Sequence, residues 1–470
     1  MKLKAPILDI PKEDPFRNDL LGRKSSAETL TELIRSTEEP LVLCINAPWG
    51  EGKSTFLAMW RQMLVAANFK TLYFNAWEND FANDAFISLI AELDLGVAEL
   101  SLTAETLPGI QEKLQKVKKL GAGLVKKAVP TAVKIATAGL VDLDELTEEA
   151  LAEYSQKMAE EQINAYEESK NSVAGFKSQL RELAASISPP DESSRSLPLV
   201  VLVDELDRCR PPYAINVLEA VKHFFSVDNV VFVLALDREQ LTHSVRSMYG
   251  HEMNAGGYLR RFIDIEYSLP APTKGAFCKA QFGRFGFDEY FRKRNGRETH
   301  YDRGQIEETF SELFDALGFS LREQERCFTM LSLAIRSTPE NYKLHPLLLS
   351  FLITLKLKAP ERYSAFVTGQ SSPKDVLAYV ESSPKGAEFM KSNYGAAIEA
   401  YLVGCRSERF TSQELATPYK EIVNSPSSAA DKKQRAERII QLLESFDFRD
   451  SLGVLPYLQG KIDLVSNFRR

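Results

Sequence analysis

The sequence predicts an α/β protein whose mostly parallel sheet is interrupted by a helical insert and followed by an all-helical C-terminal region. Three observations predict this fold: five apolar runs rich in β-branched residues, helical patterns between them, and an essentially helical pattern beyond residue 272. Near-continuous apolarity is typical of strands that are covered on both faces, and strands that alternate with helices indicate a parallel sheet. The expected strands are residues 41–47, 71–77, 199–206, 230–237 and 262–269.

Helical periodicity fills most of the remaining chain. Between the second and third expected strands, a helix at 84–95 is followed by a lysine-rich stretch (112–140) and a mixed, initially acidic one (142–187). These stretches predict an inserted helical hairpin or subdomain, which ends at a linker that begins Ser-Pro-Pro. The other expected helices between strands are 54–66, 213–225 and 239–249. The expected division is a sheet core from 1–95 and 191–275, an insert at 96–190 and a helical C-terminal domain at 276–470.

Composition narrows the class of protein. A chain of 470 residues is too long for one ordinary core, and 44% hydrophobic with 26% charged residues is typical of a soluble globular protein. The net charge of −7 argues against a surface coated entirely by nucleic acid but leaves a local basic groove open. The five scattered cysteines indicate buried reduced thiols rather than disulfides or zinc. The most apolar stretch, 120–140, contains three lysines and a proline, so we expect a cytoplasmic protein without a transmembrane segment.

A phosphate-binding loop follows the first expected strand. The segment 47–54 has an alanine, four variable residues and then Gly-Lys-Ser, and it opens a helix. Gly50 and Gly52 permit a positive φ and close approach of the backbone to phosphate. Lys53 would reach the β- and γ-phosphates, and the Ser54 hydroxyl would bind Mg²⁺. The expected ATP-binding residues here are Ala47, Pro48, Trp49, Gly50, Glu51, Gly52, Lys53, Ser54 and Thr55.

An acidic pair ends the third expected strand. Asp204 would hold Mg²⁺ at the carboxyl end of the sheet, and Glu205 would orient and deprotonate the attacking water. This pair, with another strand between the two motifs in sequence, favours the additional-strand branch of P-loop NTPases. Asp237, at the end of the next strand, would sense the γ-phosphate or would cap the helix that starts near residue 239. Because the chain has no guanine-reading Asn-Lys-x-Asp segment, ATP is preferred over GTP.

Several further motifs resemble those of one particular family of P-loop proteins. The loop PWGEGKST, with FNAW at 74–77 and VDELDRC at 203–209, resembles the KAP family of P-loop NTPases. Further matches are DLLGR at 19–23 and the segments 217–241 and 258–270.

This resemblance implies a RecA-like core of the additional-strand (ASCE) class that binds ATP with Mg²⁺. It also implies that Lys53 and Ser54 are ligands of the nucleotide and metal, that Asp204 and Glu205 are the metal and water carboxylates, and that Gly22 and Arg23 lie near the base. Asp207 and Arg208 match a family segment for which we expect a structural or coupling role.

Two departures from the family pattern matter. Many members carry transmembrane helices between the two motifs, whereas residues 96–170 here lack spanning capacity. The acidic pair of the family is often Asp-Asp, and the glutamate in this chain strengthens the expectation of hydrolysis.

Three arginines are candidates for a finger that reaches a nucleotide. Arg260 and Arg261 precede the last expected strand, and Arg336 lies in a C-terminal helix. Each could neutralise charge on the γ-phosphate of a neighbouring subunit, although paired basic residues are usually a solvated face.

Other features leave alternatives open. The segment 287–297 mixes aromatic and basic residues, as nucleic-acid contacts do, but equally fits an amphipathic helix that ends in a polar loop. The lysines of 113–134 could lie on an anionic membrane, although a packing or oligomer contact is favoured. Trp49 and Trp77 are expected to pack as core beside the nucleotide site, with stacking on adenine as the alternative.

The sequence therefore predicts an ATP-hydrolysing, homo-oligomeric regulator or motor. The resemblance to bacterial KAP members suggests a soluble component of anti-phage defence, with a protein partner bound through the C-terminal helices. Two other functions remain open: an ATP-gated switch or scaffold that assembles an effector with little hydrolysis, and a DNA-acting ATPase.

Overall fold

The computed structural model divides the chain into two compact units. The sheet unit comprises Asp9–Asp19 and Arg23–Pro270, and the helical unit comprises Met1–Leu8, Leu20–Gly22 and Ala271–Arg470. The structure describes all residues except 5, 7, 83, 101–106, 129–147, 189–195, 272–274, 294–298, 340–341, 406–410, 446–452 and 468–470.

The sheet unit is built on a parallel five-stranded sheet in the order β2-β3-β4-β1-β5. Each of the five predicted apolar runs contains one strand, so the predicted α/β fold is confirmed. β4 lies between β1 and β3, which is the arrangement of the additional-strand class. The strands are β1 (Leu41–Asn46), β2 (Thr71–Asn75), β3 (Leu199–Asp204), β4 (Val230–Leu236) and β5 (Ile265–Ser268).

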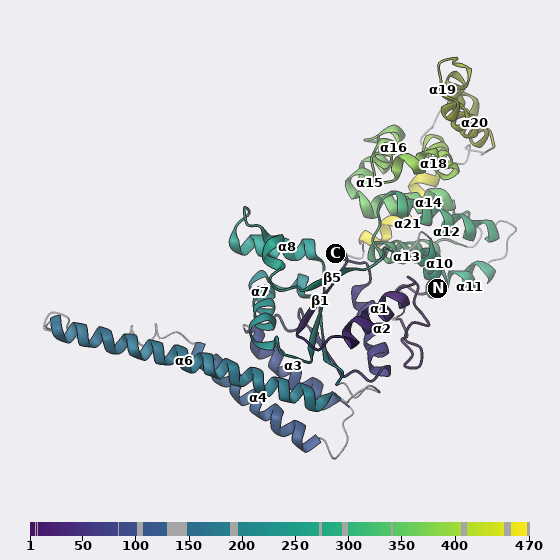
Figure 1. Ribbon diagram of the computed structural model, residues 1–470. Coiled ribbons are helices and arrows are strands. Elements are labelled where there is room, and N and C mark those ends of the chain that lie inside the picture. Colours follow the sequence, from purple (N-terminus) through teal and green to yellow (C-terminus); the bar gives the residue numbers. More distant parts are fainter. Residues whose placement is uncertain are drawn as a thin grey trace. The chain divides into compact units, whose positions relative to one another are not determined.

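Helices cover both faces of this sheet. In Figure 1, α1 and α2 lie on one face, whereas α3, α7 and α8 lie on the other. Strand β4 is buried along its whole length, as its unbroken run of apolar residues predicts. The helices are α1 (Lys24–Arg35), α2 (Lys53–Ala66), α3 (Ala85–Glu99), α7 (Pro211–Ala220, extended by a π-turn at Val221–Phe225), α8 (Arg238–Tyr249) and α9 (Ala255–Leu259).

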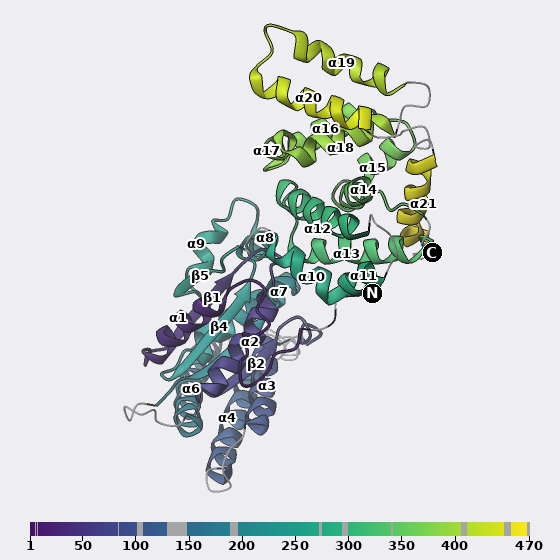
Figure 2. The same ribbon diagram turned by 90° about the vertical axis from the view of Figure 1, so that its right-hand side faces the viewer.

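The predicted insert forms two long helices, α4 (Leu107–Ala128) and α6 (Glu148–Ile187), which pack against each other within the sheet unit (Figures 1 and 2). Phe176 of α6 joins the sheet core, because its ring lies 5.3 Å from that of Phe86 on α3. Lys118 of α4 pairs with Asp94 of α3 at 2.6 Å, which supports a packing role for this lysine. Lys134 lies outside the described residues, and none of the described helices is both long and apolar enough to cross a bilayer.

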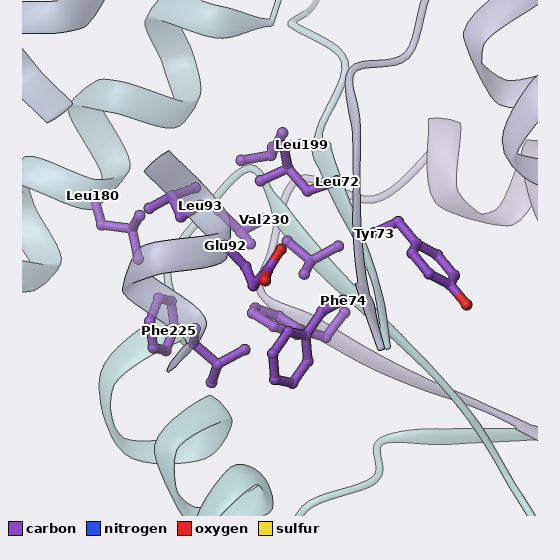
Figure 3. A pocket seen from close by; sticks show the side chains of 12 residues that line it. Leu72, Tyr73, Phe74, Glu92, Leu93, Leu180, Leu199, Phe225 and Val230 are labelled. Carbon is purple, nitrogen blue, oxygen red and sulfur yellow. The ribbon is translucent and has the colours of Figure 1, made fainter. Parts of the chain in front are cut away.

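A small cavity lies between the sheet and the helices on the α3 face (Figure 3). Its lining is apolar except for Tyr73 and for Glu92 of α3, and it includes Leu72 and Phe74 of β2. Side chains alternate between the faces of a strand, and in Figure 3 Tyr73 points away from Phe74, to the other side of β2. Tyr73 is therefore directed toward the opposite face of the sheet, where it takes part in the site described below.

The helical unit contains the predicted C-terminal helices, packed around a core rich in phenylalanine. Phe282, Phe310 and Phe328 are fully buried, and the rings of Phe282 and Phe310 each lie 5.4 Å from that of Phe328. The helices are α10 (Ala276–Phe285), α11 (Phe287–Lys293), α12 (Thr299–Ala316), α13 (Leu321–Arg336), α14 (Pro346–Lys358), α15 (Pro360–Val367), α16 (Pro373–Glu381), α17 (Gly386–Lys391), α18 (Asn393–Gly404), α19 (Ser412–Asn424), α20 (Ala430–Ser445) and α21 (Val454–Asn467).

The first residues of the chain differ from the division expected from the sequence, because they pack with the helical unit. The Lys2 amide donates to the Phe285 carbonyl at 2.7 Å, and the Ser332 hydroxyl donates to the Lys2 carbonyl at 2.8 Å. In the basic cluster 287–297, Lys293 of α11 pairs with Glu289 at 2.6 Å, and residues 294–297 lie outside the described residues.

Candidate nucleotide-binding site

The predicted phosphate loop connects the end of β1 to the start of α2. Gly50 and Gly52 have φ values of 85° and 79°, in the left-handed region where a side chain is strained. The first helical hydrogen bond after the loop runs from the Phe56 amide to the Gly52 carbonyl, so the preceding amides of α2 form the open N-terminus of the helix. Ser54 and Thr55 are exposed in this first turn. Such a helix start favours the binding of anions.

Lys53 is buried beneath the loop. Its ammonium donates to the carbonyls of Ala47 at 2.6 Å and Pro48 at 3.3 Å, and lies 3.8 Å from Oδ2 of Asp207. Burial lowers the pKa of Lys53, and the charge of Asp207 opposes this shift. A phosphate group that entered the loop would compete with two neutral carbonyls for this ammonium, and charged acceptors form the stronger hydrogen bonds.

Asp207 joins the phosphate loop to the end of β4. Its Oδ2 accepts hydrogen bonds from the indole Nε1 of Trp49 at 2.5 Å and from the Asp237 amide at 2.8 Å. Burial raises the pKa of Asp207, while Lys53 and these two donors oppose the shift. For Asp207, the family resemblance led us to expect only a structural or coupling role. A 3₁₀ turn at Leu206–Arg208 brings it back over the sheet, and its position three residues after Asp204 was the available signal.

Asp204 ends β3 and Glu205 follows it, and the two side chains lie in different environments. Asp204 is 1% exposed; its Oδ2 accepts from the Tyr73 hydroxyl at 3.0 Å and its Oδ1 from the Glu205 amide at 2.9 Å. Burial and the neighbouring Asp204 raise the pKa of Tyr73. Glu205 has a φ of 60° and pairs with Arg208 at 2.8 Å. A left-handed backbone at a residue other than glycine is uncommon and often marks a functional site.

Asp237 caps α8, as one of the two sequence interpretations expected. Its Oδ1 accepts from the amides of Glu239 at 3.1 Å and Gln240 at 3.3 Å. Its Oδ2 accepts from the Trp49 amide at 3.1 Å, so the same carboxylate also contacts the phosphate loop. The second interpretation, a sensor of the γ-phosphate, stays a prediction.

The expectation that Trp49 and Trp77 are core residues was wrong, because they are 46% and 52% exposed. Hydrogen bonding and a cationic partner hold their rings at the surface: Trp49 donates to Asp207, and the guanidinium of Arg208 lies 5.6 Å from the centre of the Trp77 ring. Both tryptophans line an open surface pocket, to which Arg208 and His243 of α8 also contribute.

Arg23 links the phosphate loop to the end of the sheet unit. It is 1% exposed, and it donates through Nη1 to the Glu51 carbonyl at 2.7 Å and through Nη2 to the Pro270 carbonyl at 3.0 Å. Burial lowers the pKa of Arg23, and Glu51 and Asp19 oppose the shift. Gly22, with a φ of 66°, precedes it in the segment assigned to the helical unit.

The structure brings together only part of the predicted site. Lys53, Asp204 and Asp237 lie at one edge of the sheet with Asp207 and Tyr73, two residues that sequence reasoning did not place there. Arg260 and Arg261 are exposed directly after α9, and Arg336 of the helical unit donates to the Met1 carbonyl. All five cysteines are described, and each is buried without a disulfide.

Replacement of Trp49 by Phe should lower the free energy of unfolding by about 1–3 kcal/mol, because buried Asp207 loses a hydrogen-bond donor. Urea unfolding followed by circular dichroism measures the change. Trp77→Phe is the matched control and should stay within about 0.5 kcal/mol of the wild type, since a phenyl ring still lies beneath Arg208. If both variants lost the same free energy of unfolding, the hydrogen bond from Trp49 to Asp207 would not be what stabilises the fold at this position.

Comparisons with known proteins identify a family and similar chains. The family model described as the KAP family P-loop domain matches residues 23–334, which is more than half of the chain. An uncharacterized protein of Methanocaldococcus jannaschii, MJ0182, is 27% identical over 170 residues, covering 34% of this chain and 86% of the relative. A solved structure of the Aeropyrum pernix ORC2 protein in ADPNP and ADP complexes matches with a TM-score of 0.34 and 13% identity, covering 94% of this chain and 95% of that one. The protein belongs to the KAP family of P-loop NTPases.

Proposed function

We propose that this chain binds Mg-ATP and hydrolyses it. One observation carries the proposal: Lys53, at the start of the phosphate-loop helix, lies 3.8 Å from the acidic turn that follows β3. A cation for the phosphates and carboxylates for metal and water therefore lie at one edge of a parallel sheet, where α/β proteins bind ligands. Family membership and the lack of a guanine-reading motif support ATP as the nucleotide.

The side chains present fit a magnesium ion. Mg²⁺ prefers oxygen ligands and in nucleotide sites takes one or two from the protein. Ser54 offers an exposed hydroxyl and Asp204 a carboxylate, and these are the residues that would hold the ion. Bound there, Mg²⁺ would neutralise charge on the β- and γ-phosphates.

The remaining residues take the roles predicted for them. Lys53 would bind the β- and γ-phosphates, and Glu205 would orient the attacking water and accept its proton. Asp237 would respond to the γ-phosphate through its contact with the Trp49 amide. Arg23 and Gly22 would lie near the base.

The test is phosphate release from ATP by the purified chain. Hydrolysis should require Mg²⁺ and should disappear in excess EDTA. The chain could instead bind ATP tightly and release no phosphate with Mg²⁺ present. That result would refute the hydrolase and favour the ATP-gated switch. Failure to bind ATP at all would remove both functions.

We also propose that the chain acts as an oligomeric regulator or motor, in bacterial anti-phage defence, with a protein partner on its helical unit. Family membership supports the general role, and exposed Arg260 and Arg261 are available to reach the nucleotide of a second copy.

ATP should raise the molar mass of the Glu205→Gln protein to a multiple of 52.8 kDa, because bound nucleotide completes the contact between copies. Light scattering after size-exclusion chromatography, with and without Mg-ATP, measures this change. The Arg260→Ala and Arg261→Ala variants, made in the same background, show which arginine the assembly needs. A monomer in every condition would refute both the assembly and the finger roles.

A further inference from the structure

The candidate water-activating residue is ion-paired within its own turn. Nη1 of Arg208 lies 2.8 Å from Oε1 of Glu205, and the two side chains are only 26% and 15% exposed. Glu205 immediately precedes the 3₁₀ turn and Arg208 is the last residue of that turn, so the pair closes over a single turn of the chain. The Arg208 amide also donates to the Glu205 carbonyl, at 3.1 Å.

Arg208 is itself held on the side of the open surface pocket. Its guanidinium lies over the ring of Trp77, which follows β2, and both residues line that pocket with Trp49. The carboxylates that act most strongly on Lys53 are instead those of Asp207, Asp237 and Asp204. Glu205 is thus engaged by a cation on the pocket side, whereas the other three carboxylates act on the lysine of the phosphate loop.

We propose that Arg208 is a positioning residue that withholds the Glu205 carboxylate from the attacking water, so that the chain as folded here hydrolyses ATP below its full rate. This inference rests on the proposed ATP hydrolysis. A general base needs a carboxylate oxygen within hydrogen-bond reach of the water, and Oε1 of Glu205 is taken by Arg208. This ion pair holds the end of the Glu205 side chain toward Arg208, so its reach toward the water depends on release by Arg208.

The test is steady-state ATP hydrolysis by full-length Arg208→Gln. Its kcat should rise about two- to five-fold with KM unchanged, since a partly exposed ion pair restrains its partners by that factor. Arg208→Lys keeps a cation and should return kcat toward the wild-type value. Arg210→Gln is the matched control, because Arg210 lies two residues along the chain and pairs with Asp80 at 3.0 Å, and it should leave kcat unchanged.

A double variant distinguishes restraint of Glu205 by Arg208 from a general loosening of the turn. Glu205→Gln/Arg208→Gln should hydrolyse ATP as slowly as Glu205→Gln alone, because the effect of Arg208 passes through Glu205. A kcat of Arg208→Gln that falls or stays constant, in a protein whose wild type hydrolyses ATP, would overturn the inference and leave the proposed function standing. Hydrolysis that is absent from the wild type and from Arg208→Gln alike would instead refute the proposed function.

Discussion

Replacement of Glu205 by Gln should lower kcat for ATP hydrolysis about 10²–10⁴-fold, the usual contribution of a general base, while ATP still binds. Gln keeps the shape of the side chain but cannot accept the proton of the attacking water. The phosphate loop is unaffected, because Lys53 and Asp207 make their contacts without Glu205. Phosphate release gives kcat, and isothermal titration with Mg-ATP gives the affinity.

Glu252→Gln is the control for Glu205→Gln, since Glu252 is an exposed glutamate of the same unit outside the site. It should match the wild type in both measurements. A Glu205→Gln protein that hydrolyses ATP at the wild-type rate would transfer the role of the base to another group. Asp207 would then be the first to examine, because burial raises its pKa and brings it nearer to that of a proton acceptor at neutral pH.

Replacement of Lys53 by Ala should weaken Mg-ATP binding about 10- to 150-fold, which corresponds to about 1.5–3 kcal/mol for hydrogen bonds to a charged group. The ammonium is the cation that lies beneath the loop, and the Ala side chain cannot reach the phosphates. Isothermal titration measures the loss. Lys119→Ala, on the exposed surface of α4, should bind ATP like the wild type.

Lys53→Ala also leaves Asp207 buried without its neighbouring cation, so stability needs a separate measurement. We expect the urea midpoint to fall, since an uncompensated buried carboxylate is costly. A variant that remains folded yet binds ATP with wild-type affinity would show that the loop does not hold the phosphates, and the proposed site would have to be abandoned.

The sheet could be predicted from sequence because the strands carry their signal locally. Each strand is a short apolar run, and β4 is buried throughout, so no alternation was needed to recognise it. The loop between β1 and α2 could also be predicted, because the sequence has a glycine at each of its two positive-φ positions. The order of the strands has no such local signal, because pairings such as that of β1 with β4 join segments far apart in the chain. Only the acidic pair, the strand between the two motifs and the family resemblance pointed to that order.

The missed residues of the site depend on contacts that no local pattern contains. Tyr73 reaches Asp204 because β2 and β3 pair in a register that matches Asn75 to Asp204, which places both side chains on one face. Trp49 was expected to pack as core beside the nucleotide site, but its indole N–H donates to the buried carboxylate of Asp207 while the residue itself stays exposed. The hydrogen bond made by the indole N–H decides where such a tryptophan lies, and the hydrophobicity of the residue does not reveal that bond.

Arg23 connects the phosphate loop to the residue at which the chain leaves the sheet unit. Its planar guanidinium holds the Glu51 carbonyl in the loop and the Pro270 carbonyl at the last residue of the sheet unit. Because the fork of an arginine is rigid, the two carbonyls cannot move apart without breaking one of these bonds. A nucleotide that rearranges the loop therefore strains the same side chain that fixes the point where the polypeptide leaves the sheet.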